Sequence, residues 1–140
     1  MGLLLLVGCA KQPVIANLNP FLAEQQAGIY LGGAAAFVSG QDVRKSPEVV
    51  IYLSDDPATR LANVTAPSEV ILGRLVAGLS GQGLGIIGAS SPVHLKFVIN
   101  ELLVRVTRQN LLYSANAKTY ITLTVENRGT VFTKVFKREA

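Results

Sequence analysis

The 140-residue sequence has few of the residues that usually build reactive sites: one cysteine, Cys9, one histidine, His94, and no tryptophan. A lone cysteine excludes an intrachain disulfide. A lone histidine, which we expect to be an ordinary surface residue, leaves no converging set for a metal site or a nucleophile triad. An exported hydrolase would need a nucleophile beside a base, and neither is apparent. The sequence therefore predicts no enzyme activity, no catalytic or cofactor-binding residue and no metal ligand.

Long apolar runs are also missing. The run that begins at Leu3 is about seven residues long, whereas a membrane-spanning helix needs about 20. With 49% hydrophobic and 16% charged residues, the composition excludes a disordered chain and is enough for one domain plus a tether.

The N-terminal run ends as a bacterial lipoprotein signal does. Leu6, Val7 and Gly8 precede Cys9, which would receive a diacylglyceryl group and become the mature N-terminus. The alternative is an ordinary free thiol. Only two residues precede the leucines, so we expect the true start upstream, and Leu6 does not fit a myristoylation motif. The predicted organisation is a signal peptide over residues 1–8, a lipidated tether over 9–28 and a periplasmic domain over 29–140 that is shortened at its C-terminus.

The charge is divided unevenly along the chain. Residues 1–88 hold five basic and six acidic side chains, a net −1, and residues 89–140 hold eight basic and three acidic, a net +5. Lys96, Lys118 and Lys134 fall on strands expected to be neighbours and would form a basic surface. This surface is either a solvated face or a contact with anionic lipid headgroups or envelope polymer. Nucleic acid is not an expected partner of an exported protein with so few aromatic residues.

The first half of the domain predicts strands and one helix. We expect strands at 29–38, closed by a turn at 39–42, then at 48–53 and briefly at 61–64, with Asp55 and Asp56 in a turn. A helix over 66–79 is indicated by Thr65 as cap, Pro67 in the first turn and an apolar stripe. That stripe consists of Ile71, Leu72, Leu75, Val76 and Leu79.

The glycine-rich stretch after this helix contains a formal GxGxxG over residues 83–88. A dinucleotide loop needs those glycines between a strand and a following helix, and here they follow a helix. We therefore interpret them as a helix C-cap and a connecting loop.

The second half alternates with a period of two, as strands do. The apolar parity changes from odd to even after Ile99, which predicts a β-bulge within residues 100–103. A turn at 108–110, a strand over 113–126, a hairpin turn at 126–130 and a returning strand over 131–136 follow. The predicted fold class is α+β: an antiparallel sheet packed on one face by an amphipathic helix, with an N-terminal lipid-anchored tether. Its open edge is covered either by further chain or by a partner.

Several short motifs resemble the YajG family of bacterial lipoproteins. They are the lipobox at residues 6–9 with the following AKQP, the GQDVR turn at 40–44, and the stretch from SPVHL at 91–95 to NLLY at 110–113. The resemblance implies a small periplasmic α/β domain anchored to the outer membrane, without an assigned enzyme activity. It also implies further C-terminal residues that include a helix.

The leading functional prediction is a non-enzymatic, lipid-anchored envelope lipoprotein that binds a periplasmic protein, lipid or cell-wall partner. The alternative is an accessory lipoprotein subunit of a lipid or solute transport system. Ala10 is not the aspartate that signals inner-membrane retention, so we expect outer-membrane placement facing the periplasm.

Overall fold

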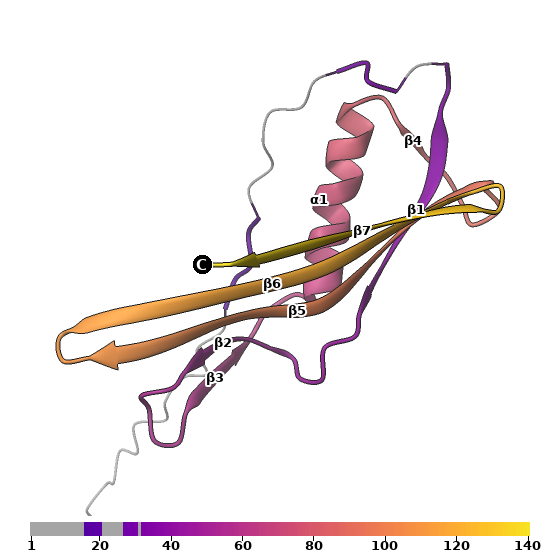
Figure 1. Ribbon diagram of the computed structural model, residues 1–140. Helices are drawn as coiled ribbons and strands as arrows, with labels where there is room; N and C mark the ends of the chain where they lie inside the picture. Colours follow the sequence, from indigo (N-terminus) through magenta and orange to yellow (C-terminus); the bar gives the residue numbers. More distant parts are fainter. Residues whose placement is uncertain (1–15, 21–26, 31) are drawn as a thin grey trace, which may run out of the picture.

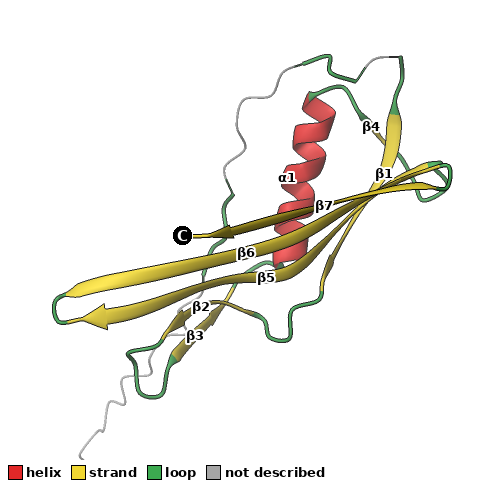
Figure 2. Ribbon diagram, in the orientation of Figure 1, coloured by secondary structure: helices red, strands yellow, loops and turns green. Residues whose placement is uncertain are grey.

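A 17-residue strand, β5 (Val93–Gln109), is the centre of the sheet, and every other part of the domain is placed relative to it. The structure is a computed structural model that describes residues 16–20, 27–30 and 32–140. Figure 2 shows the described residues as a twisted sheet with a helix on one face. Along one edge β5 pairs in parallel with β1 (Ala35–Asp42) and then with β2 (Glu48–Tyr52), and along the other it pairs antiparallel with β6 (Leu112–Asn127).

The remaining strands extend the sheet at its margins. β3 (Thr59–Ala62) pairs antiparallel with β2, the two-residue β4 (Gly85–Ile86) pairs in parallel with β1, and β7 (Thr130–Glu139) pairs antiparallel with β6. The predicted sheet was antiparallel throughout, and this is wrong for β1, β2 and β4. Parallel neighbours need a long crossover connection, and the chain between β1 or β2 and β5 contains helix α1. The strands joined by short hairpin loops, β5–β6 and β6–β7, are antiparallel.

The first strand begins and ends later than predicted. The sequence suggested a strand at 29–38 with a turn at 39–42, but β1 runs through that turn region. Gly28, Gly32 and Gly33 all have positive φ angles, which a strand cannot continue through. Strands β2 and β3 match their predictions more closely, with β3 displaced two residues toward the N-terminus.

Helix α1 (Pro67–Gly81) confirms the predicted helix at 66–79. Its N-cap is Ala66 without a side-chain hydrogen bond, so the cap predicted for Thr65 is wrong, although Pro67 does occupy the first turn. The C-terminal end of α1 is capped as predicted. The Leu84 N–H donates to Leu79 O at 3.0 Å, and Gly83 takes a φ of 96°, which confirms the glycine stretch as a cap and loop.

The helix packs on one face of the sheet, called here the helix face. Its residues Leu72, Leu75, Val76 and Leu79 contact a core of Ala36, Val38 and Leu84, with Val93 and Leu95 of β5 beside them. Phe97 and Ile99 continue this face and are 2% and 0% exposed. Figure 1 shows α1 crossing the strands of the long hairpin rather than running along them, so the helix covers part of that face only.

The predicted bulge and hairpins are confirmed. The β5–β6 register shifts between Ile99 and Glu101, which makes Asn100 the extra residue and keeps Leu102 on the helix face with Phe97. Arg128 and Gly129 form the two-residue loop between β6 and β7, with φ angles of 49° and 85°, as a type I′ turn requires.

The described residues 16–20 lie against the domain. Ala16 forms a parallel bridge with Asn63, Val64 N donates to Ala16 O at 3.1 Å, and Leu18 N donates to the Asn63 side chain. The tether predicted over 9–28 lies mostly outside the described residues and stays a prediction, although residues 16–20 within it lie on the surface of the domain. Among the described residues, no helix is both long enough and apolar enough to cross a bilayer.

Candidate binding surfaces

Strand β7 is an open edge. Among the described strands it pairs with β6 alone, and all ten of its residues are exposed. Its exposed apolar residues lie on both faces: Phe132 and Phe136 oppose Val125 and Ile121 on the helix face, and Val131 and Val135 lie on the other face, called the outer face. An edge of this length with apolar side chains is a template for adding another strand.

The backbone groups that β7 presents outward can be assigned from its pairing. Ala117 and Ala140 exchange both N–H···O bonds, at 2.8 and 3.0 Å, so they are a hydrogen-bonded pair. Such pairs alternate with non-bonded pairs along an antiparallel ladder. Counting back through the register assigns outward N–H and C=O groups to Val131, Thr133, Val135, Lys137 and Glu139.

Cationic side chains cover part of the apolar surface at this edge. The Lys134 ammonium lies 5.2 Å from the centre of the Phe136 ring, and that of Lys137 lies 4.4 Å from the Tyr120 ring. Lys118 is 3.4 Å from a carboxylate oxygen of Glu139. The edge is therefore both apolar and basic, which suits an extended partner segment with acidic and apolar side chains.

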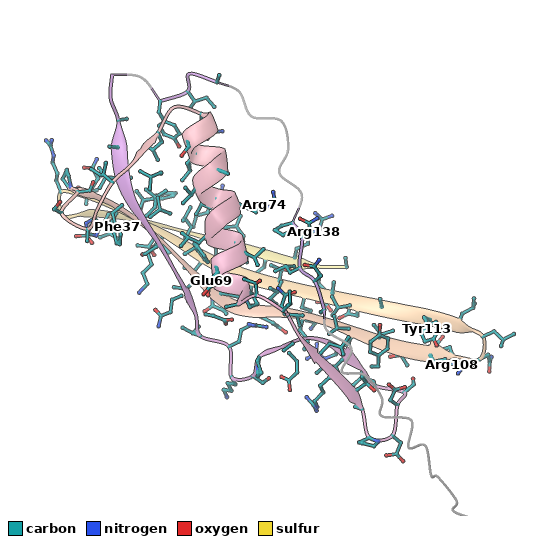
Figure 3. The ribbon with its side chains drawn as sticks, turned by 180° about the vertical axis from the view of Figure 1, so that it is seen from behind. Phe37, Glu69, Arg74, Arg108, Tyr113 and Arg138 are labelled. Atoms are coloured by element: carbon teal, nitrogen blue, oxygen red, sulfur yellow. The ribbon has the colours of Figure 1, made fainter. Side chains whose placement is uncertain are left out.

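A second surface is an apolar groove of about 350 Å³ between α1 and the helix face. The sheet contributes one wall, the helix another, and the N-terminal segment at residues 16–20 closes one side. The lining consists of Leu18, Pro20, Ile71, Arg74, Leu75, Leu102, Thr119 and Ile121. Figure 3 labels Arg74 on α1, the charged residue of this lining.

The basic surface predicted from Lys96, Lys118 and Lys134 is not one surface. Lys96 opposes Thr124 and Lys118 opposes Leu103, both on the outer face, but six strand positions separate Thr124 from Lys118, about 20 Å. Lys134 opposes Leu123, which belongs to the helix face. The three lysines therefore do not come together. The two-residue loop at Arg128 and Gly129 sets the β6–β7 register, and that register turns Lys134 to the opposite face from Lys96 and Lys118.

His94 also differs from the prediction of an ordinary surface residue. It is half-buried, and its ring packs edge-on against Phe37 with the centroids 5.4 Å apart. It opposes Glu126 across the β5–β6 pair. Its role in the structure is packing of the outer face.

Arg44, two residues after the end of β1, is a largely buried cation. Its side chain is 6% exposed and its guanidinium donates to both carboxylate oxygens of Asp42, with Nη2 to Oδ2 at 2.8 Å. It also donates to the carbonyl oxygens of Glu48 at 2.9 Å and Leu102 at 3.1 Å. Hydrogen bonding from Arg44 lowers the pKa of Asp42 below its ordinary 3.8. The Asp42–Arg44 ion pair is thus a largely buried cross-link between three strands.

Within the described part of the chain, no three His, Cys, Asp or Glu residues gather as metal ligands would. Asp55 and Asp56 lie in the exposed turn between β2 and β3. Cys9 and the lipobox residues Leu6, Val7 and Gly8 lie outside the described residues.

The fold and the sequence both have known relatives. Two solved structures share the fold at a TM-score of 0.55. One is titled as an uncharacterized protein, at 16% identity over 84% of this chain and 80% of its own. The other is protein XCC0632 from Xanthomonas campestris, at 9% identity over 91% and 74%.

The sequence relatives are lipoproteins. The uncharacterized lipoprotein YajG of Escherichia coli strain K12 is 24% identical over 139 residues, which are 98% of this chain and 71% of the relative, and the protein of strain O6:H1 gives the same values. Residues 23–140 match a family model described as an uncharacterized lipoprotein. Such membership implies a membrane-anchored envelope protein. The resemblance seen in the sequence motifs is confirmed: this chain belongs to the YajG family of uncharacterized lipoproteins.

Proposed function

We propose that this chain is a non-enzymatic, lipid-anchored envelope lipoprotein that binds a protein partner in the periplasm by strand addition at β7. The observation that carries the proposal is the open β7 edge, with outward backbone groups at five alternate positions and four exposed apolar side chains. In strand addition the backbone bonds provide affinity and the alternating side chains provide specificity.

The charge of the edge favours one kind of partner. Lys134, Lys137 and Arg138 against Glu139 give β7 a net +2. A second copy of the chain would bring like charges together, which opposes association, whereas an acidic extended segment would be attracted. The proposed partner therefore presents an extended segment of alternating acidic and apolar residues.

The proposed location is the periplasmic side of the outer membrane. Cys9 would carry the acyl groups, and Ala10 in the following position lacks the aspartate of an inner-membrane retention signal. Two or more acyl chains give a stable anchor, whereas one gives only reversible binding.

Site-specific photo-crosslinking in intact cells tests the proposal. A photoreactive phenylalanine analogue in place of Thr133, at the open edge, should give one protein adduct. The same analogue in place of Ala77, an exposed residue of α1, is the matched control and should give none. Equal adducts at both positions, or none at Thr133, would contradict docking at β7.

The absence of enzyme activity has its own test. Because His94 is the only histidine, any acid–base chemistry that uses an imidazole depends on it. Turnover of any envelope substrate that is abolished by His94→Ala would overturn the non-enzymatic proposal.

A second candidate function is an accessory subunit of a lipid or solute transport system, and the apolar groove beside α1 favours it. The two candidates differ in what the protein carries when extracted from membranes. A transport accessory should retain non-covalently bound lipid, whereas a docking module should crosslink to one protein and carry no lipid beyond its own acyl groups.

A further inference from the structure

The groove between α1 and the helix face has the chemistry of a site for a single hydrocarbon chain. Six of its eight lining residues are apolar, and Thr119 supplies the one hydroxyl. Its volume of about 350 Å³ is at the small end of the range of roughly 300–1,000 Å³ for small-molecule sites. That size suits one acyl chain rather than a two-chain lipid.

The groove lining has one charged residue, Arg74. Its side chain is exposed and donates from Nη2 to Asn19 Oδ1 at 2.7 Å, which holds its guanidinium beside the N-terminal segment. Among the described residues that line the groove, none is Asp or Glu.

This arrangement matches one ligand class. A carboxylate is bound well by arginine, whose planar guanidinium can donate two parallel N–H bonds. Transfer of an apolar chain from water into the groove is favourable, because the chain is then enclosed by Ile71 and Leu75 of the helix and by Leu102 and Ile121 of the sheet. We propose that the groove binds one long-chain fatty acid, with its chain between α1 and the sheet and its carboxylate at Arg74.

The inference names the ligand of the second candidate function and rests on it, whereas the β7 docking edge is a different surface. The two can fail independently. A groove that binds no fatty acid leaves the Thr133 crosslink unaffected, and an edge without a partner leaves the groove unaffected.

Titration with cis-parinaric acid, a fluorescent 18-carbon fatty acid, tests the inference on the full chain carrying Cys9→Ser. Saturable binding of one probe per chain is expected. Hexadecanoate should displace it at least tenfold more effectively than hexadecanol, which has the same chain without the charge. Equal displacement by the two compounds would overturn the inference. The absence of saturable binding would overturn it too, and is the outcome expected if the groove is a docking site for a partner protein instead.

Variants locate the site. Arg74→Glu should weaken binding of the probe at least tenfold, and Ile71→Trp, which fills the groove, should abolish it. Arg128→Glu removes an arginine from the β6–β7 loop, outside the groove lining, and should bind as the parent does. Circular dichroism melting confirms that each variant is folded. Unchanged binding in folded Arg74→Glu and Ile71→Trp would refute the site.

Discussion

At the scale of single residues, Arg44 joins parts of the chain that are far apart in sequence. Its donors reach the end of β1, the start of β2 and the bulged part of β5. A buried ion pair stabilises a fold only when its hydrogen-bonding capacity is satisfied, and here the guanidinium has two carboxylate and two carbonyl acceptors. The cross-link fixes where β5 exchanges its β1 partner for β2.

Replacement of Asp42 should reveal this cross-link through pH. Because the folded-state pKa of Asp42 lies below 3.8, its contribution to stability is complete above that pH and is lost as the pH falls through the folded-state value. Asp42→Asn should cost about 1–3 kcal/mol of unfolding free energy at pH 7. Urea unfolding at pH 7 and pH 3 measures the difference between parent and variant.

The difference between the two proteins should shrink at pH 3. Glu48, whose pKa is lowered by a hydrogen bond from Ser46, titrates in both proteins and cancels in the comparison. A constant difference at the two pH values would show that the Asp42 charge contributes nothing.

Gly40 is required by close packing rather than by backbone conformation. A Cβ built at Gly40 would lie 2.1 Å from Cζ of Phe97, whose ring is 2% exposed and cannot move aside. Gly40→Ala should therefore destabilise the protein by about 1–3 kcal/mol, the usual cost of overpacking. Thermal melting measures the change.

Gly73 provides the matched control. It lies inside α1 with nothing within 4 Å of a built Cβ, so Gly73→Ala should stabilise the protein by about 0.5–1 kcal/mol through helix propensity. Equal effects of the two substitutions would argue against the contact between Gly40 and Phe97.

At the scale of elements, β7 should tolerate proline at some positions and not at others. The N–H of Val135 points away from β6, whereas that of Phe136 belongs to a hydrogen-bonded pair with Ile121. Val135→Pro should keep the fold with a loss of about 1 kcal/mol or less, and Phe136→Pro should lose about 3 kcal/mol or more. Chemical denaturation distinguishes them, and the reverse order would contradict the assigned register.

The elements that the sequence predicted well are those with a local signal. The bulge at Asn100 followed from a change of parity, and α1 followed from its apolar stripe and Pro67. The start of β1 was predicted too early because the sequence pattern shows which residues are apolar but not that Gly32 and Gly33 take positive φ angles. The parallel pairs of β1 and β2 with β5 depend on long-range contacts, which no local pattern contains.

The candidate surfaces were harder to predict than the fold. Lys134 was placed with Lys96 and Lys118, although a two-residue loop at Arg128 and Gly129 would have assigned it opposite Leu123 from sequence alone. The buried Arg44 guanidinium is hydrogen-bonded to the Leu102 carbonyl, which is 58 residues away in the sequence, so no local pattern could predict this contact. The groove combines residues from four separate segments, so its existence could not be deduced before they were packed together.

At the scale of the whole molecule, the anchor and the docking edge are separate parts with separate tests. Cys9→Ser removes the proposed acylation site without touching the described domain. In cell fractionation we expect the variant to be lost from the outer-membrane fraction and found in the soluble fraction, because a chain without its acyl groups loses most of its membrane affinity.

The matched control for the anchor is Val135→Pro, which should remain in the membrane fraction. A Cys9→Ser protein that fractionates with the outer membrane as the parent does would show that the anchor is not at Cys9.

Photo-crosslinking at Thr133 tests directly whether β7 holds a periplasmic protein partner. The Thr133 crosslink is repeated in cells that carry Val135→Pro, which removes an outward N–H from the edge while the β6 pairing stays in place. We predict that the adduct disappears while the amount of membrane-bound protein is unchanged. An adduct that persists undiminished in the Val135→Pro protein would contradict strand addition at β7.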